Sequence, residues 1–393
     1  MTELAEIKDA LAAIGIYIHR TPLIRSNSFS SLTGAEVYLK TENLQKTGSF
    51  KVRGAFNRLL STDSKKVIAA SMGNHAQGVA YAASVLNRHA KIVMPLTAPI
   101  IKQEATRGYG AELVLHGENF QEALAFAMEQ KDHEFIHAFD DEKIIAGQGT
   151  AAIEIFEELD EPDIILVPVG GGGLISGIAA AAKALSPKTE IIGVQTVSAL
   201  SAYKSFCDRK LQSSETCYTL ADGISVGRVG SLTLEIMEKY VDDMVHVSED
   251  SIAMAILLFM ERKKLVVEGA GAVPLAAMLE DPARFRGKKV VLVVSGGNID
   301  FTLIDRIIHK GLVSSGRVGT LEVTVSDIPG QLSALTGIIA ARRGNIHSID
   351  HDRLSPDLSI NETRVIFTIE TRGRSHLDEI TEAIRAGGFS VRP

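Results

Sequence analysis

Short apolar runs alternate with longer amphipathic stretches over residues 1–312. The runs are rich in valine and isoleucine and cover residues 66–70, 91–94, 164–167, 190–194 and 290–294. Such runs are typical of strands covered on both faces. The stretches between them, at 74–86, 120–129 and 174–185, are rich in alanine and predict helices. Alternating strands and helices predict an α/β architecture with parallel sheets, here two lobes, whose ligands bind at the carboxyl ends of strands.

The pattern changes beyond a Gly- and Ser-rich stretch at 311–319, which predicts a linker. The expected elements are a strand at 321–325, a helix at 332–343, strands at 346–353 and 364–370, a helix at 375–386, and a short strand ending at Val391. Gly344 is the expected C-cap of the first helix. Ser375 is the expected N-cap of the second, with Asp378 in its first turn. This order is the ferredoxin-like βαββαβ layout and indicates a separate small domain.

Composition and charge exclude several classes of protein. The net charge is −7, and the chain is 45% hydrophobic and 23% charged, which is ordinary for a globular protein and lacks the basic excess of a nucleic-acid binder. Residues 164–182 carry no charge, but they contain Pro168 and four glycines, so they predict a strand, a loop and a helix rather than a membrane span.

The cysteines and the N-terminus bear on the cell compartment. The chain has two cysteines, Cys207 and Cys217, neither within a motif, and we interpret both as structural. The acidic N-terminal residues lack the order of a signal peptide. These features predict a cytoplasmic protein.

Lys51 is the first candidate for chemistry. Gly48 and Ser49 precede it, and a helix is expected to begin directly after it. A lysine at a helix N-terminus can have a lowered pKa, which imine chemistry requires. A solvated surface lysine is the alternative.

Three further turns follow apolar strands. Gly170, Gly171, Gly172 and Gly173 lie between a strand and the helix that starts at Leu174, an arrangement suited to a phosphate. Ser71, Met72, Gly73, Asn74 and His75 open another helix and could receive a carboxylate, although Ser71 or Asn74 could also simply cap that helix. Ser295 follows the strand at 290–294 and belongs to the turn Ser295-Gly296-Gly297-Asn298.

These four motifs, taken in order, resemble the pyridoxal-phosphate enzymes of fold type II, and among them the threonine/serine dehydratases and serine racemases. The resemblance covers residues 1–312 as the catalytic domain, with a smaller lobe at about 48–145. It implies that Lys51 carries pyridoxal 5'-phosphate as a Schiff base and removes the substrate Cα proton. It also implies that the cofactor contacts Phe50, Asn74, Gly170 to Gly173, Leu174 and Ser295, and that the substrate binds at Ser71 to His75. A serine beside the ring nitrogen favours β-elimination over transamination.

Two departures from the racemases are informative. Racemases carry a serine base where Met72 stands, and a thioether cannot move a proton. The acidic residues of the racemase metal site align with Gln195, Ala199 and Ser201. We therefore predict no metal there.

The predicted reaction is α,β-elimination of water from L-threonine, followed by hydrolysis of the product to 2-oxobutanoate and ammonia. L-Serine would give pyruvate and ammonia in the same way. The alternatives are a serine racemase or 3-hydroxyaspartate dehydratase on the same scaffold, or an amino-acid sensor with an inactive catalytic domain.

The tail, 319–393 after a linker at 313–318, resembles an ACT domain in its element order and in the loop Asp327-Ile328-Pro329-Gly330. This resemblance implies an amino-acid effector and a homodimer or homotetramer. A domain that only pairs subunits is the alternative.

Overall fold

The computed structural model describes residues 2–215 and 218–392, which fall into two compact units, Met1–Ile299 and Asp300–Pro393. Cys217, interpreted above as structural, lies outside the described residues, whereas Cys207 is free and exposed near the end of α9 (Ser201–Asp208). Within those ranges, none of the helices combines the length and apolar character needed to span a bilayer.

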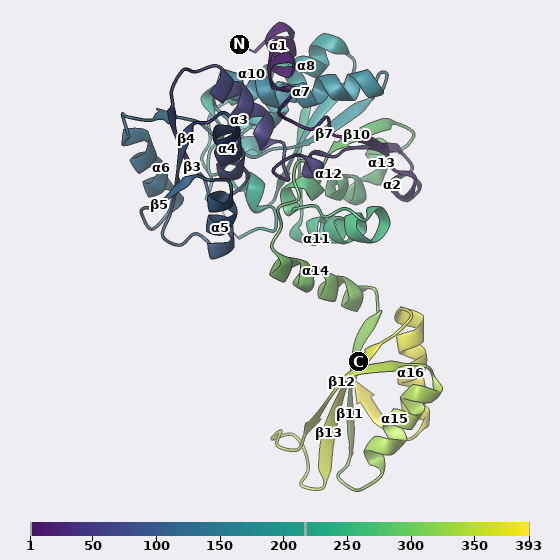
Figure 1. Ribbon diagram of the computed structural model, residues 1–393. Coiled ribbons are helices and arrows are strands. Elements are labelled where there is room, and N and C mark those ends of the chain that lie inside the picture. The colour runs from purple at the N-terminus through teal and green to yellow at the C-terminus, as the bar shows by residue number, and fades with distance from the viewer. Residues whose placement is uncertain (1, 216–217, 393) are drawn as a thin grey trace. The chain divides into compact units, whose positions relative to one another are not determined.

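The first unit contains two sheets with helices on both faces (Figure 1). The larger has the strand order β1-β2-β10-β7-β8-β9, in which β1 is antiparallel and all other pairs are parallel. Its strands are β1 (Leu23–Arg25), β2 (Glu36–Lys40), β10 (Lys289–Val293), β7 (Ile164–Pro168), β8 (Glu190–Thr196) and β9 (Asp243–Val247). The smaller is fully parallel in the order β5-β4-β3-β6. Its strands are β5 (Glu112–Leu115), β4 (His89–Met94), β3 (Lys66–Ala70) and β6 (Glu134–Phe135).

Burial on both faces explains why the strand sequences are continuously apolar. In β3, Val67 and Ala69 pack in the core shared with α3 and α4, while Ile68 and Ala70 pack against residues of α6. In the larger sheet, alternate residues of β7 and β10 pack with α1, α7, α8 and α10, and α12 packs on strands β7 to β10. Each strand therefore contributes side chains to two cores.

The helices of the first unit connect these strands. They are α1 (Leu4–Ile14), α2 (Asn27–Thr33), η1 (Glu42–Leu44), α3 (Lys51–Leu60), α4 (Asn74–Val85), α5 (Ile100–Gly108), α6 (Phe120–Glu129), α7 (Glu142–Glu158), α8 (Gly173–Leu185), α9, η2 (Asp222–Ile224), α10 (Ser231–Tyr240), α11 (Glu249–Leu258), η3 (Phe259–Lys263), α12 (Gly269–Glu280) and α13 (Pro282–Phe285).

The second unit begins with α14 (Phe301–Ser314) and continues as an antiparallel sheet in the order β12-β13-β11-β14, with two helices packed on it. Its elements are β11 (Val318–Ser326), α15 (Gln331–Ala341), β12 (Asn345–Asp352), β13 (Glu362–Glu370), α16 (Arg374–Ala386) and β14 (Ser390–Arg392). The βαββαβ order is as predicted. Residues 313–318, for which the sequence predicts a linker, are the end of α14, a turn and the first residue of β11.

The helix caps of this unit differ from the expectation. The N-cap of α16 is Gly373, two residues earlier than predicted, so Ser375 lies inside the helix and Asp378 beyond its first turn. The C-cap of α15 is Arg342, and the left-handed residue after it is Arg343 rather than Gly344. Gly344 instead has almost no room for a side chain, because a Cβ there would lie 2.9 Å from Ile339 and from Ile380.

Candidate active site

Lys51 is the first residue of α3, and its segment lies on the turn that follows β10. Ser49 forms a β-bridge with Gly296, and the Phe50 N–H donates to the Ser295 carbonyl oxygen at 3.1 Å. The lysine and the serine, far apart in the chain, thus meet through backbone hydrogen bonds. Ser295 is 2% exposed, and its hydroxyl has no hydrogen-bond partner among the described residues.

The Lys51 amine lies in a buried setting that disfavours its charge. Nζ donates to the Ala138 carbonyl oxygen at 2.8 Å and lies 5.2 Å from the centre of the Phe50 ring. Burial lowers the pKa of Lys51 to about 8, against a smaller opposing effect of Glu268. The amine can therefore lose its proton near neutral pH, as a nucleophile toward a carbonyl must.

The glycine loop follows β7, and α8 begins at Gly173, one residue before the expected start at Leu174. Gly172 is the N-cap, with φ of 95°, in the left-handed region that favours glycine. A Cβ on Gly171 would lie 2.2 Å from the Phe139 ring. The strand–loop–helix order leaves backbone N–H groups at a helix N-terminus, which is suited to a phosphate.

The segment that joins Lys51 to the glycine loop carries no sequence motif. It is the stretch after β6 that includes Ala138 and Phe139. The Ala138 carbonyl oxygen accepts the hydrogen bond of the Lys51 amine, and Phe139 packs on Gly171 and Gly173. Asp140 in the same segment accepts hydrogen bonds from Ser231 and Thr233 at the start of α10. Contacts of this kind depend on tertiary structure and leave no signal in a single sequence.

The turn before α4 is formed by residues 71–73, and the helix begins at Asn74. The Ser71 hydroxyl accepts from the Gly73 N–H at 3.2 Å. Met72 packs against the core of the smaller sheet. His75 is buried, with Nε2 3.0 Å from the Ile136 carbonyl oxygen. Burial, and then Lys51, lowers the pKa of His75 to about 3, so its ring is neutral near pH 7.

Asn74 connects this turn to two other segments. Its Nδ2 donates to Glu268 Oε1 at 2.8 Å, and its Oδ1 accepts from Asn298 Nδ2 at 2.8 Å. Glu268 precedes α12 and is 4% exposed. In the sequence, Glu268 belongs to the segment Glu268-Gly269-Ala270-Gly271, which resembles a segment of the same family that could line the site or hold its walls. A lone acid is more often structural, so the sequence assigns Glu268 no role.

The residues brought together fit a pyridoxal phosphate group. They include an amine of lowered pKa, a glycine loop at a helix N-terminus and Ser295, which is 2% exposed. Ser49 and Thr47 also have buried hydroxyls without partners among the described residues.

The residues aligned with the racemase metal site are used within the protein. Gln195 Oε1 accepts from the Tyr203 N–H at 2.8 Å, and the Ser201 hydroxyl donates to the Val226 carbonyl oxygen at 2.6 Å. In the ranges that the structure describes, no His, Cys, Asp and Glu side chains gather in a group of three that could hold a metal ion.

Comparison with known proteins agrees with this geometry. Residues 14–296 match the family described as pyridoxal-phosphate dependent enzyme, and residues 319–386 match the ACT domain. An L-threonine ammonia-lyase of Thermotoga maritima is 47% identical over 100% of this chain and 99% of its own length. The processed form of threonine deaminase isoform 2 from Solanum lycopersicum has a TM-score of 0.74 at 37% identity, covering 78% of this chain and 92% of that one. Maize serine racemase has a TM-score of 0.75 at 34% identity, covering 80% and 98%.

Proposed function

The chain belongs to the pyridoxal-phosphate dependent enzymes and carries an ACT domain, and from this premise we propose that it deaminates L-threonine to 2-oxobutanoate and ammonia. The observation that carries the proposal is the Lys51 amine, whose pKa is about 8, on a helix that meets Ser295 through the Phe50 N–H. The relatives named for threonine ammonia-lyase and threonine deaminase activity support the choice of substrate. L-Serine is proposed as a second substrate giving pyruvate.

Different residues of the site are assigned to different parts of the cofactor. The cofactor, when bound, supplies an aldehyde for the lysine and a ring that stabilises negative charge at the substrate Cα. We assign its phosphate to the glycine loop 170–173 with Leu174, its ring nitrogen to the Ser295 hydroxyl, and its ring oxygen to Asn74, with Phe50 beside Lys51. Ser295 donates or accepts one hydrogen bond without adding a positive charge, which favours loss of a β-hydroxyl over reactions that need a long-lived carbanion.

Lys51 has two roles in this proposal. It holds the cofactor, and once released by the substrate it removes the Cα proton, because its amine is neutral in a substantial fraction of molecules near pH 8. The turn Ser71 to His75 receives the substrate carboxylate through backbone N–H groups at the start of α4. His75 is buried and neutral, so it supports the turn rather than transferring protons.

A serine racemase is the second candidate, and similarity to the maize enzyme favours it. Racemisation needs a second base on the opposite face of the substrate. Met72, which stands where racemases carry a serine, packs against the core of the smaller sheet and has no titratable group. Lys51 is then the base for elimination alone.

The test of the proposed function is a ketoacid assay with L-threonine and L-serine on the wild type and on Lys51→Ala. The variant should lose roughly 10³-fold or more in turnover, because both the covalent anchor and the base are gone. Chiral analysis of the remaining substrate should show no D-isomer. Near-normal turnover of Lys51→Ala would contradict the proposal, and accumulation of D-serine would favour the racemase.

The ACT domain is proposed to bind an amino-acid effector. A cavity of about 310 Å³ lies at the loop 326–332 between β11 and α15. Asp327 and Arg353, both lining this cavity, form an ion pair with an Nε–Oδ2 distance of 2.9 Å. Backbone N–H groups at the start of α15 could receive a ligand carboxylate. We also propose that the protein forms a homodimer or a homotetramer and is located in the cytoplasm.

A further inference from the structure

Four polar groups near Lys51 form one continuous chain of hydrogen bonds. Asn298 Nδ2 donates to the Thr47 carbonyl oxygen at 2.8 Å and to Asn74 Oδ1 at 2.8 Å. Asn74 Nδ2 in turn donates to Glu268 Oε1 at 2.8 Å. The chain links the segment before α3, the turn after β10, the start of α4 and the start of α12.

The direction of each hydrogen bond in this series follows from the Thr47 carbonyl oxygen, which is the acceptor at its first end. A backbone carbonyl can only accept, so the amide nitrogen of Asn298 must face Thr47. The same nitrogen then faces Asn74, which must present its oxygen to it. The Asn74 nitrogen is left to face Glu268, and one of its two N–H groups has no acceptor among the described residues.

Glu268 is held firmly at the end of this chain. Its backbone N–H donates to the Gly296 carbonyl oxygen at 3.1 Å. A Cβ on Gly296 would lie 2.2 Å from Glu268 Oε1, so the carboxyl lies directly against the glycine backbone.

The charged groups that face Glu268 come from three elements: Asp222 in η2, Lys102 in α5 and Lys51 in α3. Burial, and then Asp222, raises the pKa of Glu268 to about 8, while the Asn74 hydrogen bond, Lys102 and Lys51 act in the opposite direction. Lys102 and Asp222 also pair with each other at 2.6 Å. Near pH 7 the carboxyl is therefore mostly neutral, and it accepts from Asn74 without a full negative charge.

We propose that Glu268 is a positioning residue of the cofactor site, which together with Asn298 holds the Asn74 amide with its nitrogen available to the ring oxygen of the cofactor. The inference rests on the function proposed above, which assigns Asn74 to that oxygen. If the Asn74 amide were rotated by half a turn, its oxygen would face the ring oxygen of the cofactor, and the two acceptors would repel each other. Glu268 thus acts through Asn74 and is separate from the base.

The test measures cofactor binding and its absorbance rather than turnover. Apoenzyme of wild type, Glu268→Gln and Glu268→Leu is titrated with pyridoxal phosphate, and the visible spectrum of the bound cofactor is recorded across pH. Glutamine keeps a neutral acceptor for Asn74 and should leave Kd within about threefold. Leucine removes the acceptor and should raise Kd about tenfold, the equivalent of one lost hydrogen bond, and should shift the pH at which the spectrum changes.

A second variant tests the direction of the chain without touching Glu268. Asn298→Asp replaces the donor to Asn74 by an acceptor, so the Asn74 amide should rotate to present its nitrogen to residue 298. The Kd for pyridoxal phosphate should then rise as in Glu268→Leu. Asn298 is exposed, so this variant is expected to fold. Glu280→Leu, at the other end of α12, is the matched control and should leave the cofactor spectrum unchanged.

The outcomes separate the two proposals. A wild-type protein that binds no cofactor on Lys51 would contradict the proposed function. Normal cofactor binding in the wild type, with unchanged Kd and spectrum in Glu268→Leu and Asn298→Asp, would overturn only the role of Glu268. An equal effect of the glutamine and leucine variants would also overturn it, because the acceptor would then not be what matters.

Discussion

At the scale of single residues, the environment of Lys51 changes what an ordinary lysine can do. Its amine donates to the Ala138 carbonyl oxygen and lies beside the Phe50 ring. Few groups are present to compensate the lost hydration of an ammonium ion, so burial favours the neutral amine.

The pH dependence of cofactor attachment should report this environment. The neutral amine attacks the cofactor aldehyde, and burial lowers its pKa from 10.5 to about 8. The rate at which apoenzyme takes up pyridoxal phosphate should therefore rise about tenfold per pH unit below about 8 and level off above it. Stopped-flow absorbance measures this rate, and a rise that continues to pH 10 would show an unperturbed lysine.

Residue types and their order in the chain indicated much of this site. Lys51, the four glycines and Ser295 are recognisable because each follows a fixed local pattern at a strand–helix junction. Ala138 and Phe139 were not placed in the site from the sequence, and Glu268 was assigned no definite role there. Their roles depend on contacts with segments that are distant in the chain, and a single carboxylate or carbonyl carries no local pattern.

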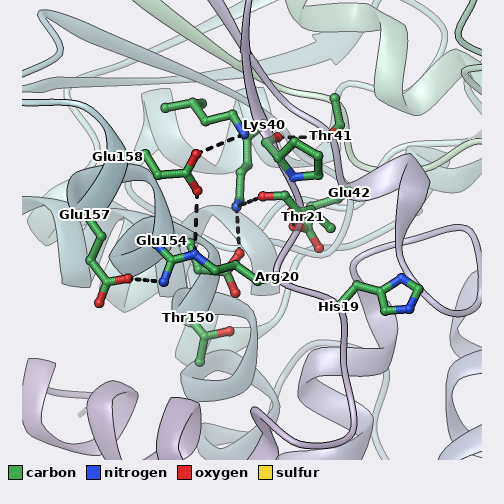
Figure 2. Close-up of polar contacts among 12 residues, drawn as sticks. His19, Arg20, Thr21, Lys40, Thr41, Glu42, Thr150, Glu154, Glu157 and Glu158 are labelled. Carbon is green, nitrogen blue, oxygen red and sulfur yellow. Dashed lines mark hydrogen bonds and ion pairs between the residues drawn. The ribbon is translucent and has the colours of Figure 1, made fainter.

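At the scale of elements, a buried ion cluster fastens α3 to α7 and to the end of β2. Figure 2 shows its pair between Lys40, at the end of β2, and Glu154 of α7. Lys40 Nζ contacts Glu154 Oε2 at 2.6 Å, and Arg53 contacts both Glu154 and Glu42 at 2.7–2.8 Å. Their side chains are at most 2% exposed. Two positive and two negative side chains leave the cluster neutral, which is what permits their burial.

Removing one member of this cluster should be costly. Glu154→Gln leaves Lys40 and Arg53 with one carboxylate between them, and it should lower the free energy of unfolding by about 3–5 kcal/mol. Glu157→Gln is the matched control on the same helix, because its pair with Arg20, at 2.6 Å, is about half exposed and should contribute less than about 1 kcal/mol. Urea denaturation measures both, and similar values would show that burial does not matter here.

Element boundaries were predictable where an apolar run or an amphipathic pattern was uninterrupted. The Lys66–Ala70 strand and the Phe120–Glu129 helix agree with the expectation. Strands β1, β2, β5, β6 and β9 were not identified, because they are short or mix polar and apolar residues. The cap of α16 was placed at Ser375 instead of Gly373, since a good capping residue can also occupy an internal position.

At the scale of the whole molecule, the two units have separate cores. Leu321, Phe367 and Ile380 belong to a core made only of residues from the second unit, whereas the cores around β3 and β7 contain only residues of the first. Separate cores allow separate unfolding.

Calorimetry of the full chain should resolve two transitions. Pyridoxal phosphate should raise the transition of the first unit, and an amino-acid effector should raise only that of the second, by about 2.7 kcal/mol of stability at a concentration of 100 Kd. A panel of amino acids on the full chain identifies the effector, and Asp327→Ala, which removes one wall of the cavity, is the control. A single transition that every ligand raises equally would contradict this independence.

The sequence by itself determined the α/β class, the added βαββαβ domain, the family resemblance and the lysine, because these depend on periodicity and on residue types at local turns. Only the tertiary structure decided how the Lys51 amine is buried, which acceptor receives it, and which way Asn74 faces. Those properties arise from chain segments that meet only after folding, such as Phe50 with Ser295 and Asn74 with Glu268. Hydrogen-bond direction and desolvation are set by such neighbours, and a linear pattern does not contain them.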